Sequence, residues 1–170
     1  LMADGGYGMW ISRIALRNFK SYQSQVFDFP QPADGKNLVL IGGLNGYGKT
    51  TLLEAVYVGL YGEEAVNHKA LDRAGLKAKG YGHFLETAFY KHALRNGEER
   101  MEVVIEIVRP NKGCLRITRK WFFTNKGQYD NQRLVIDVAT LQEVHDTLVG
   151  TVQEVMRINQ EGLAQRSAAT

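Results

Sequence analysis

The chain has 170 residues, of which 44% are hydrophobic and 23% charged, a composition that excludes a disordered chain. Its single cysteine, Cys114, excludes an internal disulfide, and no apolar run approaches the roughly 20 residues of a membrane-spanning helix. A net charge of +3 permits a nucleic-acid partner without demanding one. We therefore expect a cytoplasmic protein with one globular domain and no membrane partner.

The N-terminal part of the chain predicts strands. Residues 1–8 are glycine-rich and unpatterned, and we interpret them as a tag remnant. Apolar side chains among polar neighbours predict strands at residues 10–19 and 25–29. Residues 37–41 are a short apolar run between glycines, which predicts a buried strand.

The middle of the chain predicts helices. Apolar side chains at helical spacing indicate an amphipathic helix over residues 49–61, which Gly62 would end. Residues 63–82 show no period, so we expect a loop or a mixed segment there. Residues 84–94 predict a second helix, which stops near Asn96.

The C-terminal half predicts an antiparallel β-meander. Residues 101–108 and 115–123 alternate apolar and polar side chains, and turn-forming residues at 110–113 join them. A third strand is predicted at residues 133–138, and residues 141–156 carry apolar side chains at helical spacing.

These elements predict an α/β fold in which a mixed sheet combines the buried strand with the meander. The domain would span residues 9–140. Residues 141–170 would contain a helix that either packs on the domain or begins a coiled coil.

Residues 43–50 match the pattern Gly-x-x-x-x-Gly-Lys-Ser/Thr of a phosphate-binding loop. Its glycines let backbone N–H groups converge on phosphate oxygens, and the following helix adds the positive end of its dipole. We expect Lys49 to bridge the β- and γ-phosphates as the catalytic lysine, Thr50 to bind Mg²⁺ and Thr51 to contact the α-phosphate. The expected nucleotide ligands in this loop are Gly43, Asn45, Gly46, Tyr47, Gly48, Lys49, Thr50 and Thr51.

The loop version with Asn45 and Gly46 resembles that of the ABC-type ATPases of the SMC group, which act on chromosomes and in DNA repair. Residues 17–22, Arg-Asn-Phe-Lys-Ser-Tyr, look like the element that opens those proteins. By that resemblance, Lys20 and Ser21 would reach the nucleotide.

A longer resemblance covers roughly residues 9–138. The run 37–55, together with residues 59–62, looks like the DndD family, the SMC-like ATPases of bacterial DNA sulfur modification (phosphorothioation). It implies an ATPase that uses ATP and Mg²⁺, associates with DNA and other sulfur-modification proteins, and dimerises through ATP.

The resemblance also implies parts that the sequence lacks, namely a signature loop, a Walker B strand ending in Asp-Glu and a switch histidine. Residues 134–138 look like a Walker B strand, but no Glu follows Asp137, and the alternation explains an ordinary strand. In the SMC group these parts lie in a C-terminal lobe, so the chain resembles the N-terminal lobe of a split head. Alone it would be inactive.

Several alternatives stay open. Gln160 lies near the spacing of the family's glutamine loop and is a candidate Mg²⁺ contact, or it is simply a helix-end glutamine. The function is alternatively that of an SMC-group ATPase of DNA repair, recombination or chromosome organisation. Other readings are a non-catalytic interaction module and a small P-loop kinase or GTPase, although the sequence has no base-reading element of a GTPase.

Basic side chains are concentrated between residues 109 and 126, interleaved with aromatic ones. They either bind DNA phosphates or form the solvated face of a hairpin whose Trp121 and Phe123 are core. The basic residues are Arg109, Lys112, Arg116, Arg119, Lys120 and Lys126.

Overall fold

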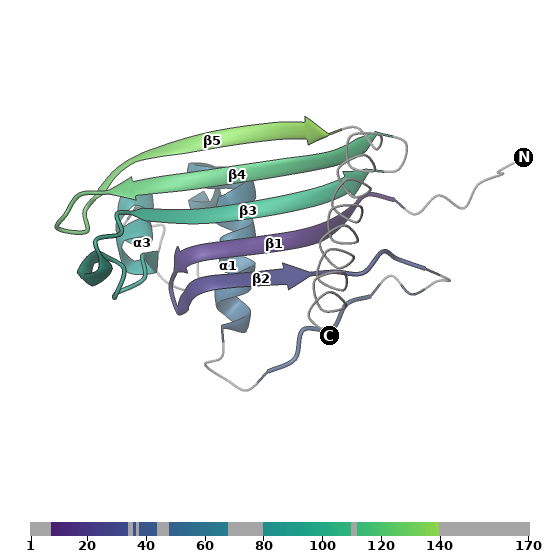
Figure 1. Ribbon diagram of the computed structural model, residues 1–170, viewed down its shortest axis with the longest axis horizontal. Helices are drawn as coiled ribbons and strands as arrows, with labels where there is room; N and C mark the ends of the chain where they lie inside the picture. The colour runs from purple at the N-terminus through teal and green to yellow at the C-terminus, as the bar shows by residue number, and fades with distance from the viewer. Residues whose placement is uncertain are drawn as a thin grey trace, which may run out of the picture.

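The computed structural model describes residues 8–33, 36, 38–43, 48–67, 80–109 and 112–139. Its frame is a five-stranded antiparallel sheet in the order β2-β1-β3-β4-β5 (Figure 1). The strands are β1 (Trp10–Phe19), β2 (Tyr22–Asp28), β3 (Arg100–Arg109), β4 (Gly113–Phe123) and β5 (Tyr129–Ala139).

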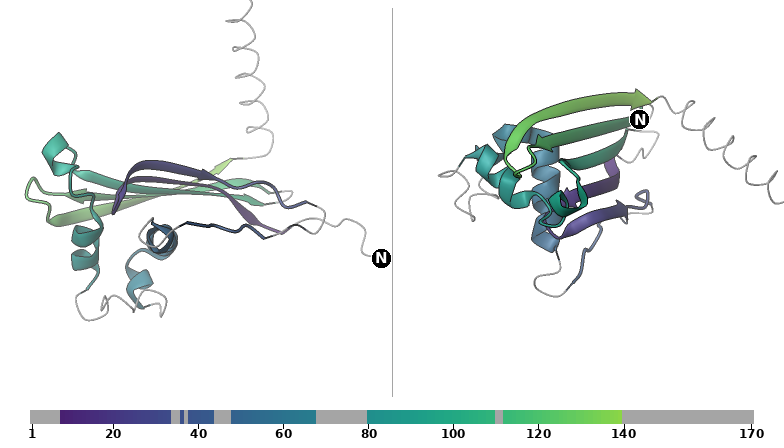
Figure 2. Two further views of the ribbon diagram at one scale, coloured as in Figure 1. Left: turned by 90° about the horizontal axis from the view of Figure 1, so that it is seen from below. Right: turned by 60° about the vertical axis from the view of Figure 1, so that its left-hand side comes forward.

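Two α-helices cover one face of this sheet, as the left-hand view of Figure 2 shows. The helical elements are α1 (Lys49–Tyr61), η1 (Gly62–Asn67), α3 (Tyr81–Ala88) and η3 (Leu94–Asn96). Helix α1 contacts β1, β3 and β4, so it crosses the middle of the sheet. No helix in the described part of the chain is long and apolar enough to cross a bilayer.

The core lies between α1 and the sheet, and strand alternation explains its composition. On β3, Met101, Val103 and Ile105 face the helices and are fully buried, whereas Glu102 and Glu106 lie on the opposite face of the strand. Gly59 lets α1 approach β3 closely, because a Cβ there would lie 2.8 Å from Val103 Cγ1.

A buried polar network joins β4 to the second helix. Trp121 is fully buried, and its indole N–H donates to the Tyr81 hydroxyl at 2.8 Å. That hydroxyl in turn donates to Gln132 Oε1 at 2.9 Å. Burial raises the pKa of Tyr81 to about 12, so it remains a donor at neutral pH.

The α/β class and the antiparallel meander are confirmed, but the predicted buried strand at residues 37–41 is wrong. Within the described residues 38–43 there is no strand, and Leu38 and Leu40 are 87% and 90% exposed. A buried strand needs partners on both sides, and the strands that the structure describes all pair elsewhere. The sheet is therefore antiparallel rather than mixed in this part of the chain.

Smaller differences concern element ends. The helix predicted at residues 84–94 instead covers Tyr81–Ala88, because Phe89 leaves the helix to form a β-bridge with Phe19. Residues 134–138 belong to an ordinary antiparallel strand paired with β4, as the alternation indicated. The predictions for residues 1–7, 141–170 and Gln160 lie outside the described residues.

Candidate phosphate-binding site

The N-terminus of α1 is built from backbone rather than side chains. The N-cap residue, Gly48, has φ 88°. No side chain makes a capping hydrogen bond at this end of the helix, and the first turn contains no acidic residue. The backbone angle favours glycine here, and a Cβ at Gly48 would stand 2.3 Å from the Tyr22 hydroxyl oxygen, so any larger residue would displace the Tyr22 ring. The first-turn N–H groups, which cannot be satisfied within a helix, are thus the candidate cradle for an anion.

Lys49 closes the loop that precedes the helix. Its ammonium donates to the carbonyl oxygen of Gly43, which brings the two ends of the predicted phosphate loop together. Thr50 is exposed and Thr51 is half-buried, both in the first turn of α1. The structure therefore gathers Gly43, Gly48, Lys49, Thr50 and Thr51 in one place, while Asn45, Gly46, Tyr47 and Gln160 lie outside its described residues.

The turn between β1 and β2 lies against the same end of α1. The Tyr22 hydroxyl donates to the carbonyl of Gly48 at 3.3 Å. The Lys20 ammonium lies 2.5 Å from Glu54 Oε2, one helical turn beyond Thr50. Ser21 is exposed and lines a polar hollow of about 420 Å³ beside the turn. The turn and the start of α1 thus meet through Tyr22 and Lys20, whereas the hollow at Ser21 is lined by no residue of α1.

Sequence analysis missed two contact residues of this site. It places Tyr22 only within the opening element at residues 17–22 and gives Glu54 no role of its own. The available signal was the position of Glu54, a charged residue between the apolar Leu53 and Ala55. Its side chain is 9% exposed, and a carboxylate buried to that extent needs a partner.

A second acidic residue supports the turn from its other side. Glu98 Oε2 accepts from Asn18 Nδ2 at 2.8 Å and from Arg17 Nη2 at 2.9 Å. The hydrogen bond from Asn18, followed by that from Arg17, lowers the pKa of Glu98, so this carboxylate stays charged at neutral pH.

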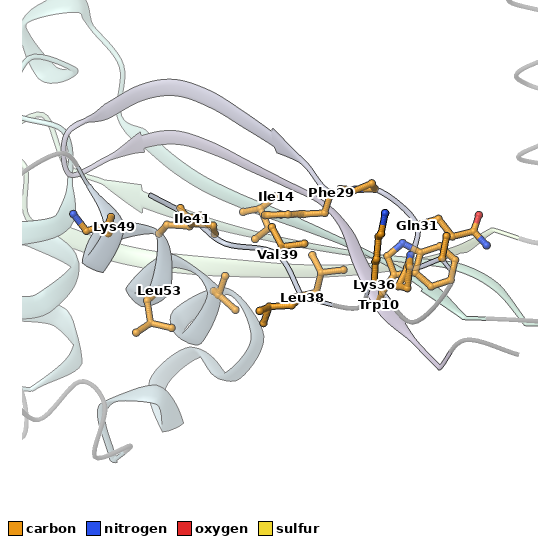
Figure 3. A pocket seen from close by; sticks show the side chains of 16 residues that line it. Trp10, Ile14, Phe29, Gln31, Lys36, Leu38, Val39, Ile41, Lys49 and Leu53 are labelled. Atoms are coloured by element: carbon orange, nitrogen blue, oxygen red, sulfur yellow. The ribbon is translucent and has the colours of Figure 1, made fainter. Parts of the chain in front are cut away.

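An apolar groove of about 740 Å³ extends from the phosphate site along α1. Figure 3 shows Lys49 at one end of the groove and Trp10 at the other. Its apolar walls come from β1, α1 and the exposed segment that contains Val39 and Ile41.

The basic residues of β4 have partners within the chain. Arg119 is only 8% exposed, and its Nε donates to the Gly59 carbonyl at 3.1 Å, so its predicted place in an exposed basic strip is wrong. On the opposite sheet face, Arg116 pairs with Glu106 at 2.7 Å. Trp121 and Phe123 are buried, which confirms them as core. These contacts favour a solvated, charge-balanced face over a continuous phosphate-binding strip.

Comparison with known proteins places this geometry in a family. A model of the AAA domain matches residues 13–165. The DNA replication and repair protein RecF of Acetivibrio thermocellus is 28% identical over 109 residues, which are 64% of this chain and 26% of RecF. The DNA double-strand break repair Rad50 ATPase of Nanoarchaeum equitans is 30% identical over 119 residues, which are 69% of this chain and 12% of Rad50.

A third relative matches a shorter part of the chain. Protein KlaB of Escherichia coli is 58% identical over 40 residues, 24% of this chain and 11% of KlaB. The chain therefore spans about a quarter or less of the length of each of these relatives. The match over most of its residues, with the α/β fold and the loop at the start of α1, shows that the chain belongs to the AAA-domain family, among the SMC-like ATPases related to RecF and Rad50.

Proposed function

We propose that the chain is the ATP-binding N-terminal lobe of an SMC-like ATPase head. The observation that carries this is the start of α1, where the Gly48 cap is in a left-handed conformation and the first turn, which begins with Lys49, contains no acidic residue. The Lys49 ammonium would neutralise the β- and γ-phosphates, and the N–H groups of residues 49–51 would donate to phosphate oxygens. The Thr50 hydroxyl would be a ligand of Mg²⁺, which supplies charge neutralisation when bound.

Binding of Mg²⁺-ATP to the purified chain tests this function directly. Titration calorimetry should show one site per chain, and Lys49→Ala should weaken ATP binding at least tenfold, because it removes a charge-assisted contact. Lys112→Ala, at the far end of the β3–β4 hairpin, is the matched control and should bind as the unchanged chain does. Equal affinities of Lys49→Ala and the unchanged chain would reject the proposal.

We further propose that hydrolysis requires a second lobe of the same protein. The relatives extend far beyond the matched region, and the apolar groove with its exposed segment, Leu38 to Ile41, supplies a surface for such a lobe. That lobe would bring the group that activates water, and two heads would pair through ATP as a homodimer. The isolated chain should therefore hydrolyse ATP at close to the background rate, and robust turnover by the pure chain would contradict this part.

The finer role is a choice between two kinds of DNA metabolism. The likeness of residues 37–55 to the DndD family supports a part in DNA phosphorothioate modification, together with other sulfur-modification proteins. The named roles of RecF and Rad50 support DNA repair as the alternative. Disrupting the gene in its host separates them. Loss of phosphorothioate from genomic DNA supports the first role, whereas intact phosphorothioate with sensitivity to double-strand breaks supports the second.

A further inference from the structure

The Lys20–Glu54 ion pair is the most buried ion pair among the described residues. Its two charged atoms are 2.5 Å apart, and the side chains are 29% and 9% exposed. The Lys20 ammonium also lies 5.6 Å from the centre of the Phe84 ring, which shields it further from water. A pair held this far from solvent is costly to form unless its geometry is fixed, so it is not an incidental surface contact.

The backbone that carries Lys20 is strained, and its conformation is held by several contacts. Lys20 has φ 50°, in the left-handed region that most residues with a Cβ avoid, and Asn18, a residue type that tolerates this region better, has φ 54°. The fully buried Asn18 donates to Glu98 and to the Arg100 carbonyl, and the Lys20 N–H donates to the Ala88 carbonyl. Strain that persists because its surroundings enforce it is typical of functional sites.

The pair also lies beside the phosphate cradle. Glu54 and Thr50 are one turn apart on α1, so they share a face of the helix. Tyr22, two residues after Lys20, contacts the carbonyl of the cap residue Gly48. The turn therefore touches α1 at its cap and at its second turn, on either side of the first-turn residues. A lysine ammonium has three donors, of which Glu54 occupies one.

We propose that Glu54 is a positioning residue that holds the Lys20 ammonium beside the first turn of α1, where it adds a second cation for the triphosphate of a nucleotide. This inference rests on the proposed ATP-binding function. Without Lys20, the Glu54 carboxylate would be an uncompensated negative charge one turn from the phosphates. Without Glu54, the long lysine side chain would lose the contact that fixes its position.

The direction in which Glu54→Gln changes ATP affinity distinguishes a positioning role from a simple effect of charge. Glu54→Gln removes a negative charge near a bound anion, so charge alone would tighten ATP binding. Positioning requires the opposite, and we expect Glu54→Gln to weaken Mg²⁺-ATP binding about fivefold and Lys20→Met to weaken it about twentyfold. In the Lys20→Met chain, adding Glu54→Gln should tighten binding, because only the repulsive charge is then removed.

The decisive measurement is a double-mutant cycle, which compares the effect of Glu54→Gln on ATP affinity in the unchanged chain and in the Lys20→Met chain. A general loss of structure would weaken binding in both chains, whereas positioning predicts weaker binding in the first and tighter binding in the second. Glu106→Gln is the matched control, since Glu106 forms a 2.7 Å ion pair with Arg116 on the opposite sheet face. Its affinity for ATP should stay unchanged. If Glu54→Gln does not fold, Glu54→Asp is the second variant. It keeps the negative charge but shortens the side chain by one methylene, so the carboxylate lies further from the Lys20 ammonium, and we again expect weaker ATP binding.

The outcomes distinguish this inference from the function on which it rests. If the unchanged chain does not bind Mg²⁺-ATP, or Lys49→Ala binds it equally well, the proposed function fails. If both of those tests succeed but Glu54→Gln or Glu54→Asp binds ATP as tightly as the unchanged chain, only the positioning role is overturned. A weakening of the same size in both backgrounds would likewise assign Glu54 to stability alone.

Discussion

The two ends of α1 are built in opposite ways. At its C-terminus, Val58 and Gly59 are buried, the Gly62 N–H donates to the Val58 carbonyl, and Arg119 donates to the Gly59 carbonyl. At its N-terminus, Lys49 and Thr50 are exposed, and the Gly48 cap has no side chain to offer. A helix fixed at one end can leave the N–H groups of the other end available to a ligand without losing its place in the fold.

The N-terminal end should be the more sensitive to one added methyl group. We expect Gly48→Ala to weaken Mg²⁺-ATP binding at least a hundredfold, because the new Cβ would meet the Tyr22 hydroxyl oxygen at 2.3 Å in a left-handed backbone. The Tyr22 ring must move aside, and the strained cap is expected to shift with the new side chain, which redirects the first-turn N–H groups. Titration calorimetry measures the effect.

Gly97→Ala is the matched control for that change. Gly97 also has a positive φ of 72°, but a Cβ there meets nothing within 4 Å, so the variant tests backbone strain without a clash. It should cost about 1 kcal/mol of stability and leave ATP affinity unchanged. A Gly48→Ala chain that binds ATP within threefold of the unchanged chain would show that the cap does not shape the site.

The C-terminal end should respond in stability. Arg119→Met keeps most of the side-chain volume but removes the charge-assisted hydrogen bond to the Gly59 carbonyl, and we expect the free energy of unfolding to fall by about 2 kcal/mol. Urea denaturation measures this change. Arg116→Met, which breaks an ion pair on the solvent side of the same strand, should cost no more than about 1 kcal/mol. Equal losses in the two variants would contradict the assignment of Arg119 as an anchor.

The two ends of α1 also differ in how much of their structure can be predicted from the sequence. The bounds of α1 follow from the phosphate-loop motif and the apolar spacing, and the alternation in β3 and β4 places both strands within two residues. Local pattern suffices there because each side chain's face is set by its own element. The contact of Arg119 with Gly59 joins residues 60 positions apart, and charge alone placed this arginine on the surface.

The failures share that physical origin. Residues 37–41 have the composition of a buried strand, yet burial depends on partner strands, which an apolar run does not specify. The Lys20–Glu54 pair depends on a left-handed backbone at Lys20, and a lysine in the sequence does not predict that conformation. Motifs thus point to the atoms that we propose face the ligand, whereas the contacts that hold those atoms in place required the structure.

Close packing at the C-terminal end gives a smaller test. Gly59→Ala would place a Cβ 2.8 Å from Val103 Cγ1, and overpacking of this kind costs up to about 3 kcal/mol. The gain in helix propensity offsets about 1 kcal/mol, so we expect a net loss of about 1–2 kcal/mol in urea denaturation. A stabilised variant would show that α1 can move away from β3 at no cost.

The smallest expected effect concerns Tyr81, whose hydroxyl accepts a hydrogen bond from the buried core residue Trp121. Its pKa is raised to about 12, mainly by burial, against an ordinary value of 10.0. Because the protonated phenol is favoured in the folded state, its contribution to stability is complete below pH 10 and is lost as pH rises towards 12. From this group alone, the free energy of unfolding should be about 1 kcal/mol lower at pH 11 than at pH 9.

Comparing the unchanged chain with Tyr81→Phe isolates that contribution. The pKa of Tyr129 is also raised by burial, but Tyr129 is present in both chains and its effect cancels. The variant should be less stable at pH 9, because the Trp121 N–H loses its acceptor, and the difference between the two chains should shrink by about 1 kcal/mol at pH 11. A difference that is the same at both pH values would mean that the Tyr81 hydroxyl ionises as readily in the folded chain as in the unfolded one, and that this side of the core is open to water.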